Sequence, residues 1–454
     1  MSHHLRSFLS AACMALLTAC GGGEGGGGGQ TGGSVGVPLP SAPVACSLED
    51  QQSWVRNHIR QDYLWNTRTP DVAPSGFSDL KSYFSASLFQ GDATIPKDRY
   101  SGFGPTPDYD LYYEQGITLG FGVAVAGQEV LGQPDRPLWV RYVEPGSPAD
   151  FAGVRRGDRV MALNGVPTPQ VISTQDFSAL VAKAEGDALS IDLLRDGQAR
   201  RLNLAAKRYD LRPVLPYRVL SGPTGQRVGY LYLQAFLTQA EQALDLAFKS
   251  LAAERVSELM IDLRYNTGGF VSVGERVASF VGGRSKNGLV YTDLVYNTNN
   301  RRLNTRYRFT DRLSWPGLQR VYILAGQRTC SASEQLISGL KGAGVDVIQV
   351  GDTTCGKPVG FNAREYCGNT FSVVMFESIN AQGLGGYYQG IAPRCPVDED
   401  WQSPLGDPND PLLRTALQHM ATGQCPVRAA QRRQESPAKR QWPWVEPMPP
   451  PTMR

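Results

Sequence analysis

Apolar residues follow three different patterns along the chain, and the first of them is helical. In LEDQQSWVRNHIRQDYLW the apolar residues recur near helical spacing, and FSDLKSYFSASLF predicts a second helix. The residues that set the first spacing are Trp54, Ile59, Tyr63 and Leu64. We therefore predict a small helical region over residues 46–110, with the character of a cap or a prodomain.

The pattern changes over residues 111–208 to short strands separated by tight turns. GITLGFGVAVAG is typical of a strand bounded by glycines, and LWVRYVEPGSPADFAGVRRGDRVMALNGVPT alternates strands and turns. A generic β-rich domain would give the same alternation.

Most of this segment resembles a PDZ domain. LGFG matches the loop that captures a peptide C-terminus, and SPADFAGVRRGDRVMALNG matches the helix, turn and strand that follow. The resemblance implies that backbone N–H groups of this loop bind a terminal carboxylate while the next strand pairs with the peptide. The loop residues are Leu119, Gly120, Phe121 and Gly122.

The third pattern, over residues 209–425, alternates strands with helices. RVGYLYLQAF, ELMIDLRYNTGG and RVYILAGQRTC predict buried strands, and AEQALDLAFKSLAAE and FVSVGERVASFVGG predict helices between them. This order predicts an α/β core with a mostly buried, mixed sheet and flanking helices.

The two ends of the chain lack core-forming patterns. Residues 1–19 have a weakly basic start and a short apolar run, which predicts a secretory signal peptide. Residues 20–45 are rich in Gly, Ser and Pro and predict a flexible tether. Residues 426–454 are rich in Arg, Gln and Pro and are predicted to be disordered.

Leu17-Thr18-Ala19-Cys20 resembles the bacterial lipoprotein box. The resemblance implies that Cys20 is lipidated and becomes the new N-terminus, which would hold the protein to a membrane. Since Gly21 and not Asp follows, lipoprotein sorting implies the outer membrane, facing the periplasm. The alternative is a plain signal peptide with a chance cysteine.

Composition limits the partners and cofactors of the chain. The 454 residues carry a formal net charge of +3 with scattered basic residues, so nucleic acid is not an expected partner. Six of the eight cysteines remain after Cys13 and Cys20, an even number that suggests disulfides in an exported protein. A zinc site is the alternative, but no CxxC pair is present and histidine is rare, so no metal is expected.

RTCSASEQ places small hydroxyl residues where a strand turns into a helix that starts near Ser333. Helix capping explains most serines at such a place. The same geometry suits a nucleophile, because unpaired N–H groups at a helix start can stabilise an oxyanion beside Ser331.

A serine nucleophile needs a base, and the histidines are poorly placed. His58 and His419 lie in predicted helices, away from the glycine turns at strand ends where α/β folds build sites. Lysine, which is scarce in this chain, works as a base only when burial lowers its pKa. Lys357 follows an apolar strand within VIQVGDTTCGKPVG, although a lone loop lysine is usually solvated.

SASE, the Gly-Lys loop and DLRYNTGG together resemble the C-terminal processing, or tail-specific, serine peptidases over roughly two thirds of the chain. The resemblance implies that Ser331 is the nucleophile and Lys357 the general base. It also implies that Gly268 and Ala332 donate N–H groups to an oxyanion hole, with no metal or organic cofactor. Ser333 and Glu334 would then be helix-capping residues.

Two departures from the family pattern point to a divergent branch. Phe361 stands where the family often has a glutamine that orients the lysine, so another group or water must do so. The spacing from Ser331 to Lys357 is also one residue longer than the commonest one. Loss of activity is therefore an open alternative.

The cysteines give a separate hypothesis. Cys330 precedes Ser331, and Cys355 lies two residues before Lys357, so a disulfide between them would clamp the two segments together. Pairing Cys367 with Cys395 and Cys46 with Cys425 would complete the set.

The sequence thus predicts a serine endopeptidase that hydrolyses envelope proteins and holds their exposed C-terminal tails. A lipoprotein that binds tails without cutting them is a second possibility. A scaffolding envelope protein is a third, but it leaves the set of Ser331, Lys357 and Gly268 unexplained. The oligomeric state and natural substrate are not indicated.

Overall fold

A computed structural model describes residues 46–126 and 136–426 of the protein. The predicted signal peptide, the lipidation site Cys20, the tether over residues 20–45 and the tail from residue 427 lie outside the described residues. No helix among the described residues is long and apolar enough to span a membrane.

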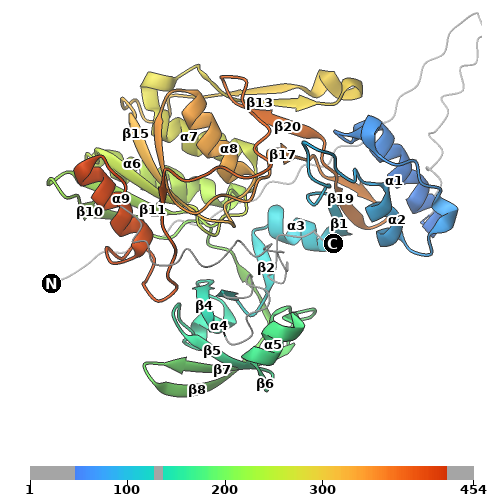
Figure 1. The fold of residues 1–454 in the computed structure, drawn as a ribbon, viewed down its shortest axis with the longest axis horizontal. Helices are drawn as coiled ribbons and strands as arrows, with labels where there is room; N and C mark the ends of the chain where they lie inside the picture. Colours follow the sequence, from blue (N-terminus) through green and yellow to red (C-terminus); the bar gives the residue numbers. More distant parts are fainter. Residues whose placement is uncertain (1–45, 127–135, 427–454) are drawn as a thin grey trace, which may run out of the picture. The chain divides into compact units, whose positions relative to one another are not determined.

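A six-stranded mixed sheet forms the centre of the α/β region (Figure 1). Its order is β10 (Arg218–Ser221), β11 (Arg227–Tyr232), β12 (Glu258–Asp262), β15 (Arg320–Ala325), β16 (Asp346–Gly351) and β21 (Cys395–Pro396). Only β10 pairs in the antiparallel sense, and the other strands run parallel. The predicted mixed sheet with flanking helices is confirmed.

Helices cover both faces of this sheet, which explains why its strands are continuous apolar runs. One face packs on α6 (Glu241–Ala253), α7 (Val271–Lys286) and α8 (Ala332–Gly342). The other face packs on α9 (Pro411–Thr422). Neighbouring residues of one strand therefore enter different cores. Ile261 of β12 and Ile323 of β15 join the first core, whereas the residues before them, Met260 and Tyr322, join the second.

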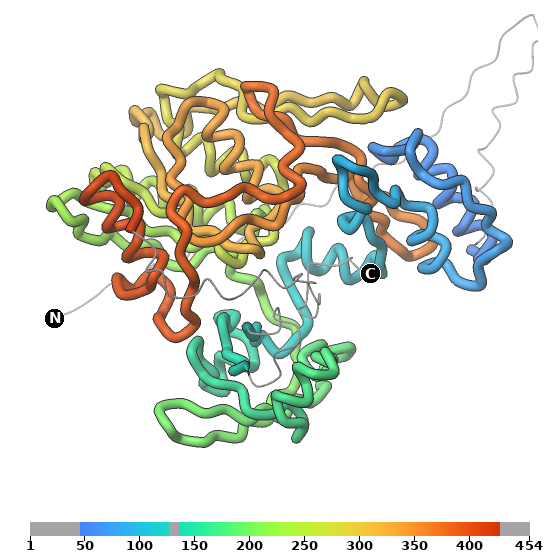
Figure 2. The backbone as a smooth tube through the Cα atoms, viewed as in Figure 1, coloured from blue at the N-terminus to red at the C-terminus, as the bar shows by residue number. Residues whose placement is uncertain are grey.

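The parallel strands bring three loops to the same edge of the sheet. Strand β12 ends at the turn that contains Gly268, β15 ends before Ser331, and β16 ends before Lys357. Since β12, β15 and β16 are neighbours, the three loops lie beside one another, and their backbone paths can be followed in Figure 2.

The predicted PDZ-like segment has its own sheet and its own core. The sheet order is β3 (Val123–Ala126), β4 (Leu138–Val143), β5 (Arg159–Leu163), β7 (Ala188–Arg195) and β8 (Gln198–Ala205), with β6 (Val166–Pro167) beside β5. Its helices are α4 (Pro148–Phe151) and α5 (Thr168–Thr174), and β2 (Ile117–Gly120) pairs with β9 (Lys207–Asp210). Among the described residues, β3 has β4 as its one strand neighbour.

The N-terminal region is helical, as predicted, but it also contributes a strand. It contains α1 (Leu48–Asp62), α2 (Leu80–Ser87), β1 (Gly102–Pro105) and α3 (Thr106–Tyr113). Strand β1 pairs with β19 (Asn369–Ser372), which pairs with β18 (Arg364–Tyr366). A fourth sheet has the order β14 (Thr305–Arg308), β13 (Val290–Tyr296), β20 (Phe376–Ile379) and β17 (Val359–Gly360).

One of the three predicted disulfides is present, and the other two pairings are wrong. Cys330 pairs with Cys355, as predicted, but Cys46 pairs with Cys367 and Cys395 with Cys425. The N-terminal helices pack on the β18–β19 hairpin, which brings Cys46 to Cys367. Helix α9 packs beside β16, the neighbour of β21, which brings Cys425 to Cys395.

Candidate active site

Ser331 occupies the N-cap position of α8, two residues before the predicted helix start. Its backbone has a φ of 56° and a ψ of −118°, a conformation that a residue with a side chain rarely adopts. Such strain persists only where the surrounding structure enforces it. Ala332 is the first helical residue, so its N–H group has no acceptor within the helix.

Gly268 lies directly against Ser331. A Cβ atom on Gly268 would come within 2.7 Å of the Ser331 Cβ and 3.2 Å of the Ala332 nitrogen, and its φ is 111°. Only glycine fits here, for both reasons. The N–H of Gly268 donates to Oδ1 of Asn266 over 2.8 Å, so an oxyanion would have to replace or share that acceptor.

Asn266 joins the turn that contains Gly268 to the segment that contains Ser331. Its carbonyl oxygen accepts the N–H of Cys330 and the hydroxyl of Ser333, each over 3.0 Å. Its Nδ2 donates to the carbonyl of Leu233 over 3.0 Å, and its side chain is fully buried. The expectation that Ser333 caps α8 is wrong, because its hydroxyl is directed at Asn266 and away from the helix.

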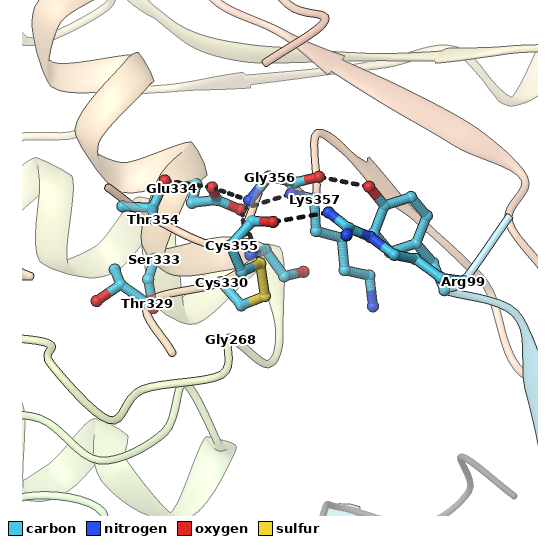
Figure 3. The surroundings of a disulfide bond; sticks show 12 residues. Arg99, Gly268, Thr329, Cys330, Ser333, Glu334, Thr354, Cys355, Gly356 and Lys357 are labelled. Atoms are coloured by element: carbon cyan, nitrogen blue, oxygen red, sulfur yellow. Dashed lines mark hydrogen bonds between the residues drawn. A yellow bond between two sulfur atoms is a disulfide. The ribbon is translucent and has the colours of Figure 1, made fainter. Parts of the chain in front are cut away.

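Glu334 connects the segment that contains Ser331 to the loop that contains Lys357, which we call the lysine loop (Figure 3). Its buried carboxylate accepts the N–H of Ser331 over 3.0 Å and the N–H groups of Gly356 and Lys357, each over 2.8 Å. The Thr354 hydroxyl also donates to it. Glu334 therefore caps the helix, as predicted, and holds a second loop that the prediction did not include.

The environment of this carboxylate pulls its pKa in two directions. Loss of hydration raises the pKa of Glu334, while its hydrogen bonds to Thr354 and to backbone N–H groups act to lower that pKa. Four donors converge on one side chain, which is how a buried carboxylate is stabilised without a cation.

The Cys330–Cys355 disulfide makes a second link between the same two segments. The Cα atoms of the pair lie 5.2 Å apart, and the bond stands immediately before Ser331 and two residues before Lys357. The predicted covalent clamp is therefore present in the structure, as Figure 3 shows.

The Lys357 amine lies over an aromatic ring. Its Nζ is 5.0 Å from the centroid of the Phe361 ring. A cation–π contact favours the protonated amine, whereas a general base must be neutral. Phe361, found where the family often has glutamine, is thus a direct neighbour of the predicted base.

The N-terminal region reaches the lysine loop from the other side. Arg99 donates to the carbonyl of Cys355 over 2.9 Å, and the Tyr100 hydroxyl donates to the carbonyl of Gly356. No pattern in the sequence indicates these contacts, because the partners are 256 residues apart. Asn266 belongs to the DLRYNTGG motif, but the motif does not by itself indicate the contacts of this side chain.

The predicted tail-binding loop covers the end of β2 and the two residues between β2 and β3. Leu119 and Gly120 belong to β2, and Phe121 and Gly122 follow it. Gly122 has a φ of 77°, and a Cβ on it would overlap the Ser147 side chain at the start of α4. The predicted roles of these four residues stay predictions.

A pocket joins this loop to the predicted catalytic turn. Its lining includes Gly122 and Glu144 from the PDZ-like segment, and Thr267 and Arg328 from the α/β core. Thr267 precedes Gly268, and Arg328 lies three residues before Ser331. Loss of hydration raises the pKa of Glu144 to about 8.

Among the described residues, two clusters have the residue types of metal ligands: Cys330, Glu334 and Cys355, and Cys395, His419 and Cys425. The two cysteines of each cluster are joined in a disulfide. Their sulfur atoms are therefore not the thiolates that zinc requires.

Three regions of the chain match known sequence families. Residues 227–394 match "Peptidase family S41", residues 139–195 match "PDZ domain", and residues 50–102 match "Peptidase S41 N-terminal domain". These matches lie in the α/β core, the PDZ-like segment and the helical region, respectively.

Several curated relatives are named carboxyl-terminal-processing peptidases or proteases. The chain is 27% identical to carboxyl-terminal-processing peptidase 2, chloroplastic, of Arabidopsis thaliana, over 50% of this chain and 43% of that protein. It is 29% identical to a carboxyl-terminal-processing protease of Synechocystis sp., over 47% of each chain. The chain therefore spans about half the length of the curated relatives it matches.

The crystal structure of a candidate S41 protease from Bacteroides fragilis has a similar fold. The match has a TM-score of 0.66 at 23% identity and covers 82% of this chain and 97% of that chain. The three matched regions lead to one conclusion: residues 227–394 are a peptidase family S41 region, and the chain also carries an S41 N-terminal domain and a PDZ domain.

Proposed function

We propose that this protein is a serine endopeptidase in which Ser331 is the nucleophile and Lys357 the general base. The observation that carries the proposal is the strained N-cap position of Ser331, held against Gly268 and linked twice to the Lys357 loop. A helix cap alone requires neither this strain nor a covalent bond to a lysine-bearing loop.

The proposed reaction proceeds through an acyl-enzyme. Neutral Lys357 takes the hydroxyl proton of Ser331, whose oxygen attacks the substrate carbonyl carbon. The N–H groups of Ala332 and Gly268 stabilise the oxyanion, after Gly268 gives up its bond to Asn266. Lys357 then passes the proton to the leaving amine, the peptide C–N bond breaks, and water hydrolyses the ester in the same way.

The proposed substrates are proteins with exposed C-terminal tails. Strand β3 is an edge strand among the described residues, so an extended tail can add to it by backbone hydrogen bonds. Leu119, Gly120, Phe121 and Gly122 would hold the terminal carboxylate. The pocket from Gly122 to Thr267 would lead the chain towards Ser331.

We further propose that the protein works in the bacterial envelope, anchored through Cys20 to the outer membrane and facing the periplasm. The support is the lipoprotein-like motif and the three disulfides, which are typical of oxidising compartments. Metabolic labelling with a palmitate analogue would test it, since Cys20→Ala should remove the label.

Turnover of an unstructured protein with an apolar tail tests the peptidase proposal. We expect Ser331→Ala and Lys357→Met to abolish cleavage while the melting temperature stays within a few degrees of the wild type. Ser257→Ala and Lys249→Met change exposed residues of the same types and should cleave normally. Full activity in Ser331→Ala would reject the assigned nucleophile.

A tail-binding protein without catalysis is the second candidate, and the Phe361 contact favours it. If the Lys357 amine stays charged above that ring, no base is available to Ser331. This candidate predicts that the wild type and Ser331→Ala bind a tail peptide equally well and that neither cleaves it at any pH.

A further inference from the structure

A turn in the N-terminal domain, residues 98–101, is built around one buried carboxylate. Asp98 accepts the Tyr63 hydroxyl over 2.7 Å and the Ser101 hydroxyl over 2.6 Å. It also accepts the N–H groups of Tyr100 over 2.7 Å and Ser101 over 3.1 Å. With four donors on one carboxylate, the turn presents its next two side chains in fixed directions.

Those two side chains are Arg99 and Tyr100, and both bind carbonyls of the lysine loop. Arg99 donates to the Cys355 oxygen over 2.9 Å, and Tyr100 donates to the Gly356 oxygen. Burial raises the pKa of the Tyr100 hydroxyl, so it remains a protonated donor at neutral pH.

Glu334 holds the opposite edges of the same peptide groups. The carbonyl of Cys355 and the N–H of Gly356 belong to one peptide plane, bound by Arg99 and Glu334. The carbonyl of Gly356 and the N–H of Lys357 belong to the next plane, bound by Tyr100 and Glu334. Figure 3 shows Cys355 and Gly356 between Glu334 and Arg99.

Two consecutive planes held at both edges fix the backbone that leads into Lys357. The direction of the Lys357 side chain from its Cα is then set, which a lone glycine loop would not achieve. Gly356 has a φ of 85°, and a Cβ on it would come within 2.3 Å of the Tyr388 carbonyl, so the loop has no room to shift on that side.

We propose that Arg99 and Tyr100 are positioning residues for Lys357, and that the S41 N-terminal domain thereby completes the catalytic site. The inference rests on the proposed peptidase function. The Cys46–Cys367 disulfide and the pairing of β1 with β19 hold the domain in place. The domain is thus a permanent part of the site, not a prodomain that can be removed.

The test compares four variants of the full chain on an unstructured substrate. Tyr100→Phe removes only the hydroxyl, and we expect kcat to fall about fivefold to tenfold with KM unchanged. Arg99→Ala should lower kcat to a similar extent. The Arg99→Ala/Tyr100→Phe double variant should lower kcat about 30-fold or more. Arg99→Lys should recover part of the kcat lost in Arg99→Ala, because it keeps a donor. Arg60→Ala and Tyr217→Phe are matched controls away from the loop, with expected wild-type kcat.

Hydrogen exchange of residues 353–358 gives a readout independent of catalysis. The Gly356 and Lys357 amides should exchange faster in the double variant and at the wild-type rate in the controls. If the wild type cleaves and the double variant matches it in kcat and exchange, the positioning role is overturned. If the wild type cleaves nothing but the variant exchanges faster, the proposed function fails and the loop contacts stand.

Discussion

Ser331 and Lys357 donate their backbone N–H groups to the same carboxylate oxygen of Glu334, over 3.0 Å and 2.8 Å. The two nitrogens are therefore no farther apart than two hydrogen bonds. One fully buried side chain, three residues after the predicted nucleophile, thus decides how the segments of the predicted nucleophile and the predicted base meet.

Glu334→Gln should reduce peptide hydrolysis at least 100-fold. The amide keeps one acceptor oxygen but turns its NH2 towards backbone N–H donors, which leaves at least one buried donor unpaired and costs about 1–3 kcal/mol of folding stability. Steady-state kinetics and urea unfolding would measure the two losses. Glu365→Gln changes an exposed glutamate and is the control. Near-normal activity in Glu334→Gln would show that the shared carboxylate does not organise the site.

Removal of the Cys330–Cys355 disulfide should lower activity beyond its effect on stability. The pair Cys395–Cys425 is a matched control, since both have Cα atoms 5.2 Å apart and sequence separations of 25 and 30. Loop-closure entropy predicts a similar cost for each, about 3.5 kcal/mol. We expect both double Cys→Ala variants to melt at similar temperatures, but only Cys330→Ala/Cys355→Ala to lose kcat. Equal kcat in the two variants would reject a catalytic role for the clamp.

Phe361→Gln should extend activity to lower pH. The aromatic ring lies within cation–π reach of the Lys357 amine and favours its protonated form, so removal of the ring favours the neutral amine. The acid limb of the pH profile of kcat/KM should therefore move to lower pH. Phe361→Leu separates the two effects, because it removes the ring without adding an amide. An unchanged acid limb in both variants would mean that the ring does not affect the base.

Glu144→Gln should stabilise the protein above neutral pH. The folded-state pKa of Glu144, about 8, exceeds the unfolded value near 4.3, so the folded state binds more protons between these values. Wild-type stability from this group therefore falls as pH rises from 4.3 to 8, and then levels off. Since water reaches part of the pocket, we expect the variant to gain about 1–2 kcal/mol at pH 8 and nothing at pH 4. A constant gain at both pH values in chemical unfolding would contradict the shifted pKa.

Local spacing in the sequence was enough to predict the elements and the loops that carry the candidate chemistry. Apolar runs identified β12, β15 and β16, and parallel strands necessarily bring their following loops to one edge. That relation places Gly268, Ser331 and Lys357 in neighbouring loops, and it makes Cys355 a short-range partner for Cys330. The catalytic roles themselves stay predictions.

The other two disulfides show where such reasoning stops. Cys46 and Cys367 are 321 residues apart, and their pairing follows from how the N-terminal helices pack on the β18–β19 hairpin. With six cysteines, the spacing alone cannot choose among the possible pairings. Packing between distant elements made that choice.

The sequence by itself determined the main strands and helices of the α/β core, the strand-and-turn character of the PDZ-like segment and the residue types available for catalysis. Only the tertiary structure decided that Glu334 bridges two loops, that Gly268 donates to Asn266, and that Arg99 reaches the lysine loop. The physical reason is the separation along the chain over which each kind of contact acts. Periodicity fixes which neighbours a residue has along one element, whereas the partner of a buried hydrogen-bonding group is set by whichever distant backbone the packed core brings within 3 Å.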